Sequence, residues 1–209
     1  MKKKENNSDF KMKLKILELI KEIVSIEGWS QNISKKLINK NINREELTYL
    51  FPNGYKDMLK FSLDEINYSL EKKIRKIDVI NLPINRRIKK ILMSRIELLN
   101  KNNKFFKKTF YHLLLPQNSK ILKKSLYKSV DTMWYLAGDN STDFNFYTKR
   151  IVLAAIYTSA IFIFINKNID EVEINIDKNL KKISKFPKIK ERFSFIKENL
   201  PIFLKSMMN

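Results

Sequence analysis

The 209-residue sequence predicts an all-α protein, and two observations carry that prediction. Apolar residues recur three to four positions apart through most of the chain, which is the spacing of an amphipathic helix. Only three glycines occur, Gly28, Gly54 and Gly138, and each lies where a periodic segment ends, as expected of a residue that ends helices. No segment shows the sustained alternation of a strand, so we expect helices packed around one apolar core.

Residues 11–54 predict a helix-turn-helix-like part that follows a disordered tail at residues 1–10. A long first helix ends at Gly28, and two short helices follow it. Ser30 can cap the second helix and Asn43 the third, because a side-chain oxygen at that position accepts hydrogen bonds from the free N–H groups of the first turn. The inner face of the first helix is expected to contain Ile16, Ile20, Ile23 and Val24.

Residues 55–186 predict a larger helical domain. A fourth helix is expected over residues 55–77, and a fifth begins at Pro83, whose missing N–H costs nothing in the first turn. A sixth helix ends before Pro116. The core faces of these helices are expected to contain Met58, Leu59, Leu63, Ile66, Leu70, Ile74, Ile84, Ile88, Ile91, Leu92, Ile96, Leu99, Phe105, Phe106, Phe110, Leu113 and Leu114.

Two helices on either side of Gly138 form the centre of the predicted fold. The second begins near Asp143, where a negative charge in the first turn is favourable, and continues through the uncharged residues 151–165. That run is shorter than the roughly 20 residues that span a bilayer, so we expect a buried helix of a soluble protein. The apolar face of the first helix is expected to contain Leu126, Val130, Met133, Trp134 and Ala137. A weaker amphipathic segment follows at residues 170–184, with Ile174, Leu180 and Ile183 on its apolar face.

Residues 187–209 predict a C-terminal amphipathic helix. Aromatic and aliphatic residues recur at helical spacing, while the basic residues lie mostly elsewhere around the helix. This pattern is typical of a helix at a membrane surface, and a last helix docked on the core or on a second subunit has the same pattern. The residues expected to bind the membrane are Phe193, Ile196, Leu200, Phe203 and Leu204.

The composition indicates an anionic partner and excludes most familiar enzyme chemistry. A net charge of +20 favours a nucleic acid or an anionic membrane, although lysine usage spread over the whole surface explains it equally well. The absence of cysteine removes disulfides, thiolate chemistry and the usual zinc ligands. The single histidine, His112, has Thr109 instead of glutamate three residues before it. We therefore expect no catalytic residue, no metal, no cofactor and no enzymatic activity.

The helix-turn-helix-like part makes DNA binding the alternative function. A recognition helix presents Arg, Lys, Asn or Gln to bases and phosphates. The third predicted helix instead carries the adjacent acids Glu45 and Glu46, which oppose a polyanion. We therefore expect no nucleic-acid partner and keep a transcription regulator as the alternative.

The aromatic residues near Arg150 are candidates for a binding surface. Phe146 and Tyr147 are adjacent, so on a helix their side chains point about 100° apart and cannot both face one interior. At least one is expected to reach a surface or a cavity, where it resembles a protein-interaction anchor. Most aromatics on an apolar stripe are core residues, however, and the apolar residues of the later helices suit a ligand cavity as well as a solid core.

Residues 131–150 carry an ordered motif, Asp-x-Met-Trp-x-x-Ala-Gly-Asp-x-Ser-Thr-Asp-Phe-Asn-aromatic-Tyr-Thr-Lys/Arg-Arg, followed by Leu-Ala-Ala-Ile-Tyr at residues 153–157. This run closely resembles the ubiquinone-biosynthesis accessory proteins known as the ninth member of the coenzyme Q series. Similarity also appears at residues 28–30, 50–54 and 114–116, so the resemblance covers most of the chain up to about residue 186.

The resemblance implies a tetracycline-repressor-like fold, homodimeric, that binds lipid instead of DNA. It implies a non-catalytic protein that binds an isoprenoid quinone precursor or phospholipid at an anionic membrane and presents the precursor to the di-iron demethoxyubiquinone hydroxylase. The partner-binding residues that it implies by position are Asp131, Met133, Asp143, Phe146, Tyr147 and Arg150. The residues expected to line the lipid site are Phe110, Leu114, Met133, Trp134, Ala155 and Tyr157.

Two further expectations follow. Position 146 holds Phe where the family usually has Trp, which keeps the apolar anchor and loses the indole donor. The polar residues 1–9 do not resemble a transit or signal segment, which favours the bacterial cytoplasm, peripheral on the inner membrane, over the mitochondrial matrix.

Overall fold

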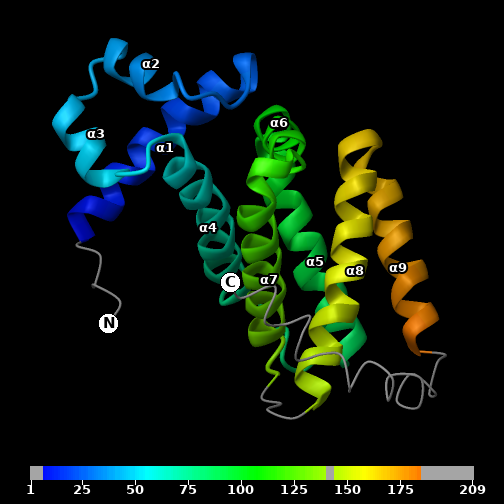
Figure 1. Ribbon diagram of the computed structural model, residues 1–209. Coiled ribbons are helices and arrows are strands. Elements are labelled where there is room, and N and C mark those ends of the chain that lie inside the picture. Colours follow the sequence, from blue (N-terminus) through cyan, green and yellow to red (C-terminus); the bar gives the residue numbers. More distant parts are fainter. Residues whose placement is uncertain (1–6, 140–143, 185–209) are drawn as a thin grey trace. The chain divides into compact units, whose positions relative to one another are not determined.

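The computed structural model describes residues 7–139 and 144–184, and in these ranges every regular element is helical (Figure 1). The predicted all-α class is therefore confirmed, while the tetracycline-repressor-like arrangement stays a prediction. The elements are α1 (Asn7–Glu27), α2 (Ile33–Asn39), α3 (Arg44–Leu50), α4 (Tyr55–Ile74), α5 (Ile84–Lys101), α6 (Asn103–Leu113), the 3-10 helix η1 (Pro116–Asn118), α7 (Ser119–Leu136), α8 (Phe144–Asn166) and α9 (Ile169–Ser184). The predicted membrane-binding residues Phe193, Ile196, Leu200, Phe203 and Leu204, and the predicted partner residue Asp143, lie outside the described residues.

The chain divides into two compact units, each built from two stretches of sequence. Unit 1 comprises residues 1–66 and 99–119, and unit 2 comprises residues 67–98 and 120–209. Helices α4 and α5 each contribute residues to both units, so the division does not follow the continuous ranges expected from the sequence.

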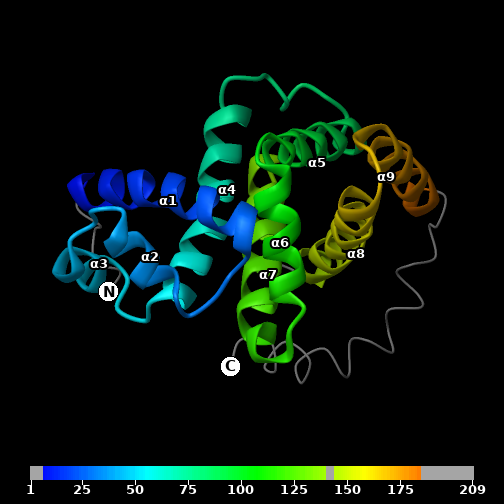
Figure 2. The same ribbon diagram turned by 90° about the horizontal axis from the view of Figure 1, so that it is seen from above.

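In unit 1, α1 packs against α2 and α6 (Figures 1 and 2). The indole N–H of Trp29 donates to the hydroxyl oxygen of Thr109 at 2.9 Å, and its ring packs on Phe105. His112 stacks on Trp29 and meets the edge of Tyr55. Burial lowers the pKa of His112, because desolvation disfavours the charged imidazolium. All four residues expected on the inner face of α1 are buried.

The ends of the first helices agree with the predictions from the sequence in two places and differ from them in two others. α1 ends at Gly28, whose φ is +84°, and the Asn43 side chain accepts from the backbone N–H groups of Glu45 and Glu46 at the start of α3. α1 begins at Asn7, however, so residues 7–10 are helical and not part of a disordered tail. Ser30 does not cap α2: the N-cap residue is Asn32, which makes no side-chain capping hydrogen bond.

In unit 2, α9 packs along α8 (Figures 1 and 2). The contact buries Val172 and Ile176, which are one helical turn apart. Ile174 lies between them in sequence and on the other side of α9, with 66% of its surface exposed, so its assignment to the apolar face was wrong. Lys89 of α5 pairs with Glu173 and Asp177 of α9, and these hydrogen bonds raise its pKa.

α8 has 23 residues, and its bounds agree with the helix expected from near Asp143 through residue 165. Residues 146–166 form a segment that is long and apolar enough to cross a membrane by length and composition, a test that a soluble core helix also meets. About half of this segment is buried, and Ala155 and Phe162 are exposed. The expectation that α8 is surrounded on all sides is therefore wrong. Ile84 and Leu114 were also expected in the core, but both are exposed and lie at the ends of their helices.

Candidate functional site

The candidate site lies in unit 2, where α7 ends and α8 begins, and Gly138 fixes its backbone. Its φ of +79° belongs to the left-handed region, which glycine adopts without steric cost. The N–H of Gly138 donates to the carbonyl oxygen of Tyr135, and the N–H of Asp139 donates to that of Trp134, which is the Schellman pattern at a helix end. A Cβ at Gly138 would stand 3.3 Å from a guanidinium nitrogen of Arg87, which donates to the carbonyl oxygen of Ala137. This turn places Asp139 beside the first turns of α8.

The buried Arg150 holds the turn and the two helices together. Its guanidinium donates to Asp131 on α7 at 2.8 Å and lies 3.2 Å from the carboxylate of Asp139. It also donates to the carbonyl oxygen of Phe146, one turn earlier on α8. The side chain of Asp139 is almost fully buried, whereas that of Asp131 is half exposed. A buried arginine needs such charged acceptors, because desolvation of an unpaired ion is costly.

Lys149 and Trp134 complete this arrangement, which we call the Arg150 cluster: Asp131, Trp134, Asp139, Lys149 and Arg150. The ammonium of Lys149 lies 2.6 Å from the second oxygen of Asp139 and 5.6 Å from the ring centre of Trp134. The indole N–H of Trp134 donates to the backbone carbonyl of Lys149 at 2.9 Å. Two cations and two carboxylates thus balance within the cluster, and each contact joins α7 or the turn to α8.

Three aromatic residues lie beside the cluster, and we call them the aromatic surface: Tyr127, Phe146 and Tyr147. The Arg150 guanidinium carbon lies 3.2 Å from the ring centre of Phe146, and the rings of Phe146 and Tyr147 meet edge to face at 5.1 Å. Tyr147 is 37% exposed, which confirms that at least one of the adjacent aromatics reaches the surface. Burial raises the pKa of Tyr127, and the negative charge of Asp131 raises it further. Sequence reasoning missed Tyr127, although it lies one helical turn before Asp131.

The predicted partner-binding residues therefore separate into two groups. Asp131, Phe146, Tyr147 and Arg150 lie together at the α7–α8 junction. Met133 is fully buried and contributes no surface. The assignment of a partner to these residues stays a prediction.

The six predicted lipid-lining residues do not share one environment. Phe110 and the exposed Leu114 belong to unit 1, whereas the other four belong to unit 2. Within unit 2, Met133, Trp134 and Tyr157 are buried, and Ala155 is exposed. A lipid site lined by all six stays a prediction.

Tyr157 belongs to a second buried group, the Arg95 cluster: Asn67, Arg95, Ser129 and Tyr157. The Arg95 guanidinium donates to the oxygens of Asn67, Ser129 and Tyr157, each at 2.7 Å, and lies 5.1 Å from the tyrosine ring centre. Among the described residues no carboxylate forms an ion pair with Arg95. The four side chains come from α4, α5, α7 and α8. The sequence does contain a signal for this group, because Arg95 interrupts the apolar face of α5 between Leu92 and Leu99.

Comparison with known proteins identifies the segment that carries the site. Residues 120–186 match the family model described as COQ9. The ubiquinone biosynthesis protein COQ9, mitochondrial, of Rattus norvegicus is 57% identical over 47 residues, which are 22% of this chain and 15% of the rat protein. The Bos taurus protein of the same name is 42% identical over 66 residues, 32% of this chain and 21% of that protein.

A longer and more distant match extends outside this segment. The probable ubiquinone biosynthesis protein coq9, mitochondrial, of Dictyostelium discoideum is 27% identical over 167 residues. The match covers 76% of this chain and 54% of the Dictyostelium protein, so the chain spans about half the length of that relative.

These relatives also correct the expected location. All three are named as mitochondrial proteins, so the prediction of a bacterial cytoplasmic protein was wrong. The polar residues 1–9 did not predict the compartment correctly. A targeting segment is not part of the folded domain, and the domain itself does not encode the compartment. The resemblance to the COQ9 family, which the motif at residues 131–150 predicted, is confirmed.

Proposed function

We propose that this protein is a non-catalytic accessory protein of mitochondrial ubiquinone biosynthesis. In this proposal it binds an isoprenoid quinone precursor at an anionic membrane and presents it to the di-iron demethoxyubiquinone hydroxylase. The observation that carries the proposal is that the segment matching the COQ9 model, residues 120–186, contains the whole Arg150 cluster and the whole aromatic surface. The names of the similar proteins support the pathway.

The aromatic surface has the properties of a docking site for a protein. Tyr147 and Phe146 are held by contacts to each other and to Arg150, so little conformational freedom is lost when a partner covers them. Aromatic and arginine side chains at the centre of an interface contribute much of its binding energy. We therefore assign the hydroxylase to this surface.

α8 supports the lipid part of the proposal. Its exposed side chains include Tyr147, Ala155 and Phe162, so apolar surface continues along the helix from the aromatic surface. An isoprenoid chain gains roughly 0.8 kcal/mol for each methylene that it removes from water, so it needs such a covering to leave the membrane. The net charge of +20 favours an approach to anionic lipid head groups.

Native mass spectrometry of the full chain tests the lipid step. Protein expressed in quinone-producing cells is expected to carry a non-covalent mass that matches an isoprenoid quinone precursor or a phospholipid, and mild activation should release it. A protein that stays lipid-free, both as isolated and after incubation with vesicles that contain demethoxyubiquinone, would contradict the proposal. Retention of the same protein on one DNA sequence would favour the transcription regulator.

A further inference from the structure

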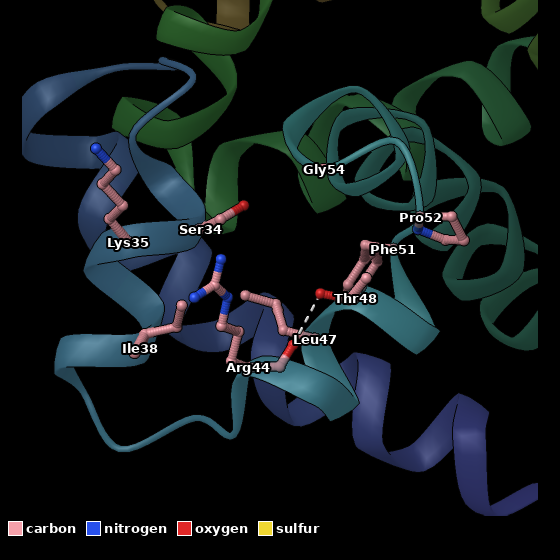
Figure 3. Close-up of a pocket in the computed structure, with 9 residues that line it drawn as sticks. All are labelled: Ser34, Lys35, Ile38, Arg44, Leu47, Thr48, Phe51, Pro52 and Gly54. Carbon is pink, nitrogen blue, oxygen red and sulfur yellow. Dashed lines mark hydrogen bonds between the residues drawn. The ribbon is translucent and has the colours of Figure 1, made fainter.

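Unit 1 contains a pocket of about 360 Å³ between α2, α3 and the turn that leads to α4 (Figure 3). Its walls are held in place by local contacts. The Asn43 side chain fixes the first turn of α3, and Gly54, with a φ of +56°, closes the turn by donating to the carbonyl oxygen of Phe51. The nine lining residues are Ser34, Lys35, Ile38, Arg44, Leu47, Thr48, Phe51, Pro52 and Gly54.

The lining carries two cations and no carboxylate. Figure 3 shows the guanidinium of Arg44 pointing toward Ser34, whereas the ammonium of Lys35, on the neighbouring helix, points away from both. Within the described ranges neither cation forms an ion pair. The nearby lysines differ, since Lys36 pairs with Glu27 and Lys40 pairs with Glu22. Arg44 therefore has guanidinium donors available to a ligand, and Lys35 adds a positive charge nearby.

The two hydroxyl groups of the pocket differ in whether they can donate a hydrogen bond to a ligand. Thr48 already donates its proton to the backbone carbonyl of Arg44 at 2.9 Å. Ser34 makes no such side-chain hydrogen bond in the described structure, so its hydroxyl can donate to a bound group. One guanidinium and one hydroxyl donor form a site for an anion, and the planar fork of arginine suits phosphate oxygens in particular.

The apolar part of the lining consists mainly of Ile38 from α2 and of Leu47 and Phe51 from α3 and the residue that follows it. A volume of about 360 Å³ is within the range of sites for small organic ligands and exceeds the needs of a single inorganic ion. A phosphate monoester carries about −1.5 to −2 charges at pH 7, so Arg44 can bind it directly and the nearby charge of Lys35 attracts it at longer range. We propose that this pocket binds the phosphate group of a small organic phosphate monoester, with its apolar part against Ile38, Leu47 and Phe51.

The sequence around the pocket argues against duplex DNA as the occupant. Glu45 directly follows Arg44, is exposed, and would lie close to a phosphate backbone that approached α3. A small ligand confined to the pocket avoids this repulsion. The proposal is independent of the α7–α8 junction and of the function proposed above, because all nine residues belong to unit 1.

Isothermal titration calorimetry of the full chain with phenyl phosphate at low ionic strength tests the proposal. Arg44→Gln is expected to weaken binding about tenfold, since it removes charge-assisted hydrogen bonds, and Lys35→Gln about threefold, because its ammonium points away from Arg44 and Ser34. Lys11→Gln is the matched control, an exposed lysine of α1 that lies outside the pocket, and it should leave the affinity unchanged. Equal effects of all three substitutions, or no binding by the wild type, would overturn the proposal.

A second binding experiment tests the apolar part of the lining. Ile38→Ala should weaken the binding of phenyl phosphate and leave the weaker binding of inorganic phosphate unchanged. Equal affinity of the wild type for these two probes would overturn the proposed monoester site. Competition by phosphatidic acid vesicles that Arg44→Gln abolishes would support the same phosphate chemistry and identify its source as a lipid head group. Displacement of phenyl phosphate by a short DNA duplex would assign the cations to nucleic acid and overturn the proposal.

Discussion

Two buried arginines of unit 2, Arg150 and Arg95, satisfy their charge in opposite ways. Arg150 pairs with two carboxylates, one buried and one half exposed, and lies against Phe146, whose ring meets the exposed ring of Tyr147. Arg95 donates only to neutral oxygens in the described structure and is fully buried. The comparison indicates that the Arg95 cluster fixes four helices against one another, while the Arg150 cluster shapes a surface.

The largest effect is expected from Arg95→Ala. This substitution removes three buried hydrogen bonds to a charged donor, leaves the oxygens of Asn67, Ser129 and Tyr157 unsatisfied and opens a cavity. We expect the free energy of unfolding, measured by urea denaturation, to fall by about 4 kcal/mol. Arg95→Lys, which keeps the charge but not the planar fork, should lose less. A loss below about 1 kcal/mol for Arg95→Ala would show that the cluster does not hold the helices together.

Arg150→Met should destabilise the protein by a smaller amount, about 2 to 3 kcal/mol. The substitution leaves the buried carboxylate of Asp139 without one partner, but Lys149 still pairs with it at 2.6 Å. Arg86→Met is the matched control, an exposed arginine of α5, and should change the free energy of unfolding by less than about 0.5 kcal/mol. A larger loss for Arg150→Met than for Arg95→Ala under the same denaturation conditions would contradict the conclusion that the Arg95 cluster contributes more to the free energy of unfolding.

Gly138→Ala separates backbone strain from crowding in the turn beside the Arg150 cluster. Alanine in the left-handed region costs about 1 kcal/mol, and a Cβ here would also lie 3.3 Å from both Arg87 and Ile80. Gly28→Ala is a close control, because its φ is similar and no atom lies within 4 Å of the added Cβ. We expect a larger decrease in melting temperature for Gly138→Ala than for Gly28→Ala. Equal decreases would mean that the Arg87 contact adds nothing.

The smallest expected effect is a pH dependence of stability that arises from His112, a residue outside both clusters. Because burial lowers the pKa of His112 below about 6.5, the unfolded chain binds a proton more readily than the folded one. Its contribution to stability is present above pH 6.5 and is lost as the pH falls through that range. His112→Phe keeps an aromatic ring beside Trp29 and Tyr55 and should flatten the decline of melting temperature between pH 7 and pH 5. An unchanged decline of the melting temperature in His112→Phe would mean that other titratable groups cause it.

The comparison of the two arginines also shows what the sequence could predict. Helices with one apolar face were assigned well, since burial follows helical spacing directly: all six core residues expected on α4 are buried. On α9 and α8 the spacing was ambiguous, because several faces are apolar and the choice depends on which neighbour packs there. Ile174 was misplaced for that reason, and Ala155 proved to be exposed.

The candidate site was predictable only as a position on the chain. The motif located Asp131, Phe146, Tyr147 and Arg150, and adjacency on a helix required one aromatic to be exposed. The pairing of Arg150 with Asp139 depends on the path of the turn, and the Arg95 cluster depends on four helices meeting. Such long-range contacts leave no periodic pattern in a single sequence.

The most direct test of the account is capture of the purified hydroxylase by the immobilised full-length protein. Tyr147→Ala removes the exposed ring of the aromatic surface, and Tyr135→Ala removes a ring from α7 that is 66% exposed and is not part of that surface. We expect Tyr147→Ala to weaken binding about thirtyfold or more, as loss of an interface hot spot does, and Tyr135→Ala to leave the affinity unchanged, with both variants folded by circular dichroism. Unchanged hydroxylase affinity for Tyr147→Ala would contradict the assignment of the partner to the α7–α8 junction.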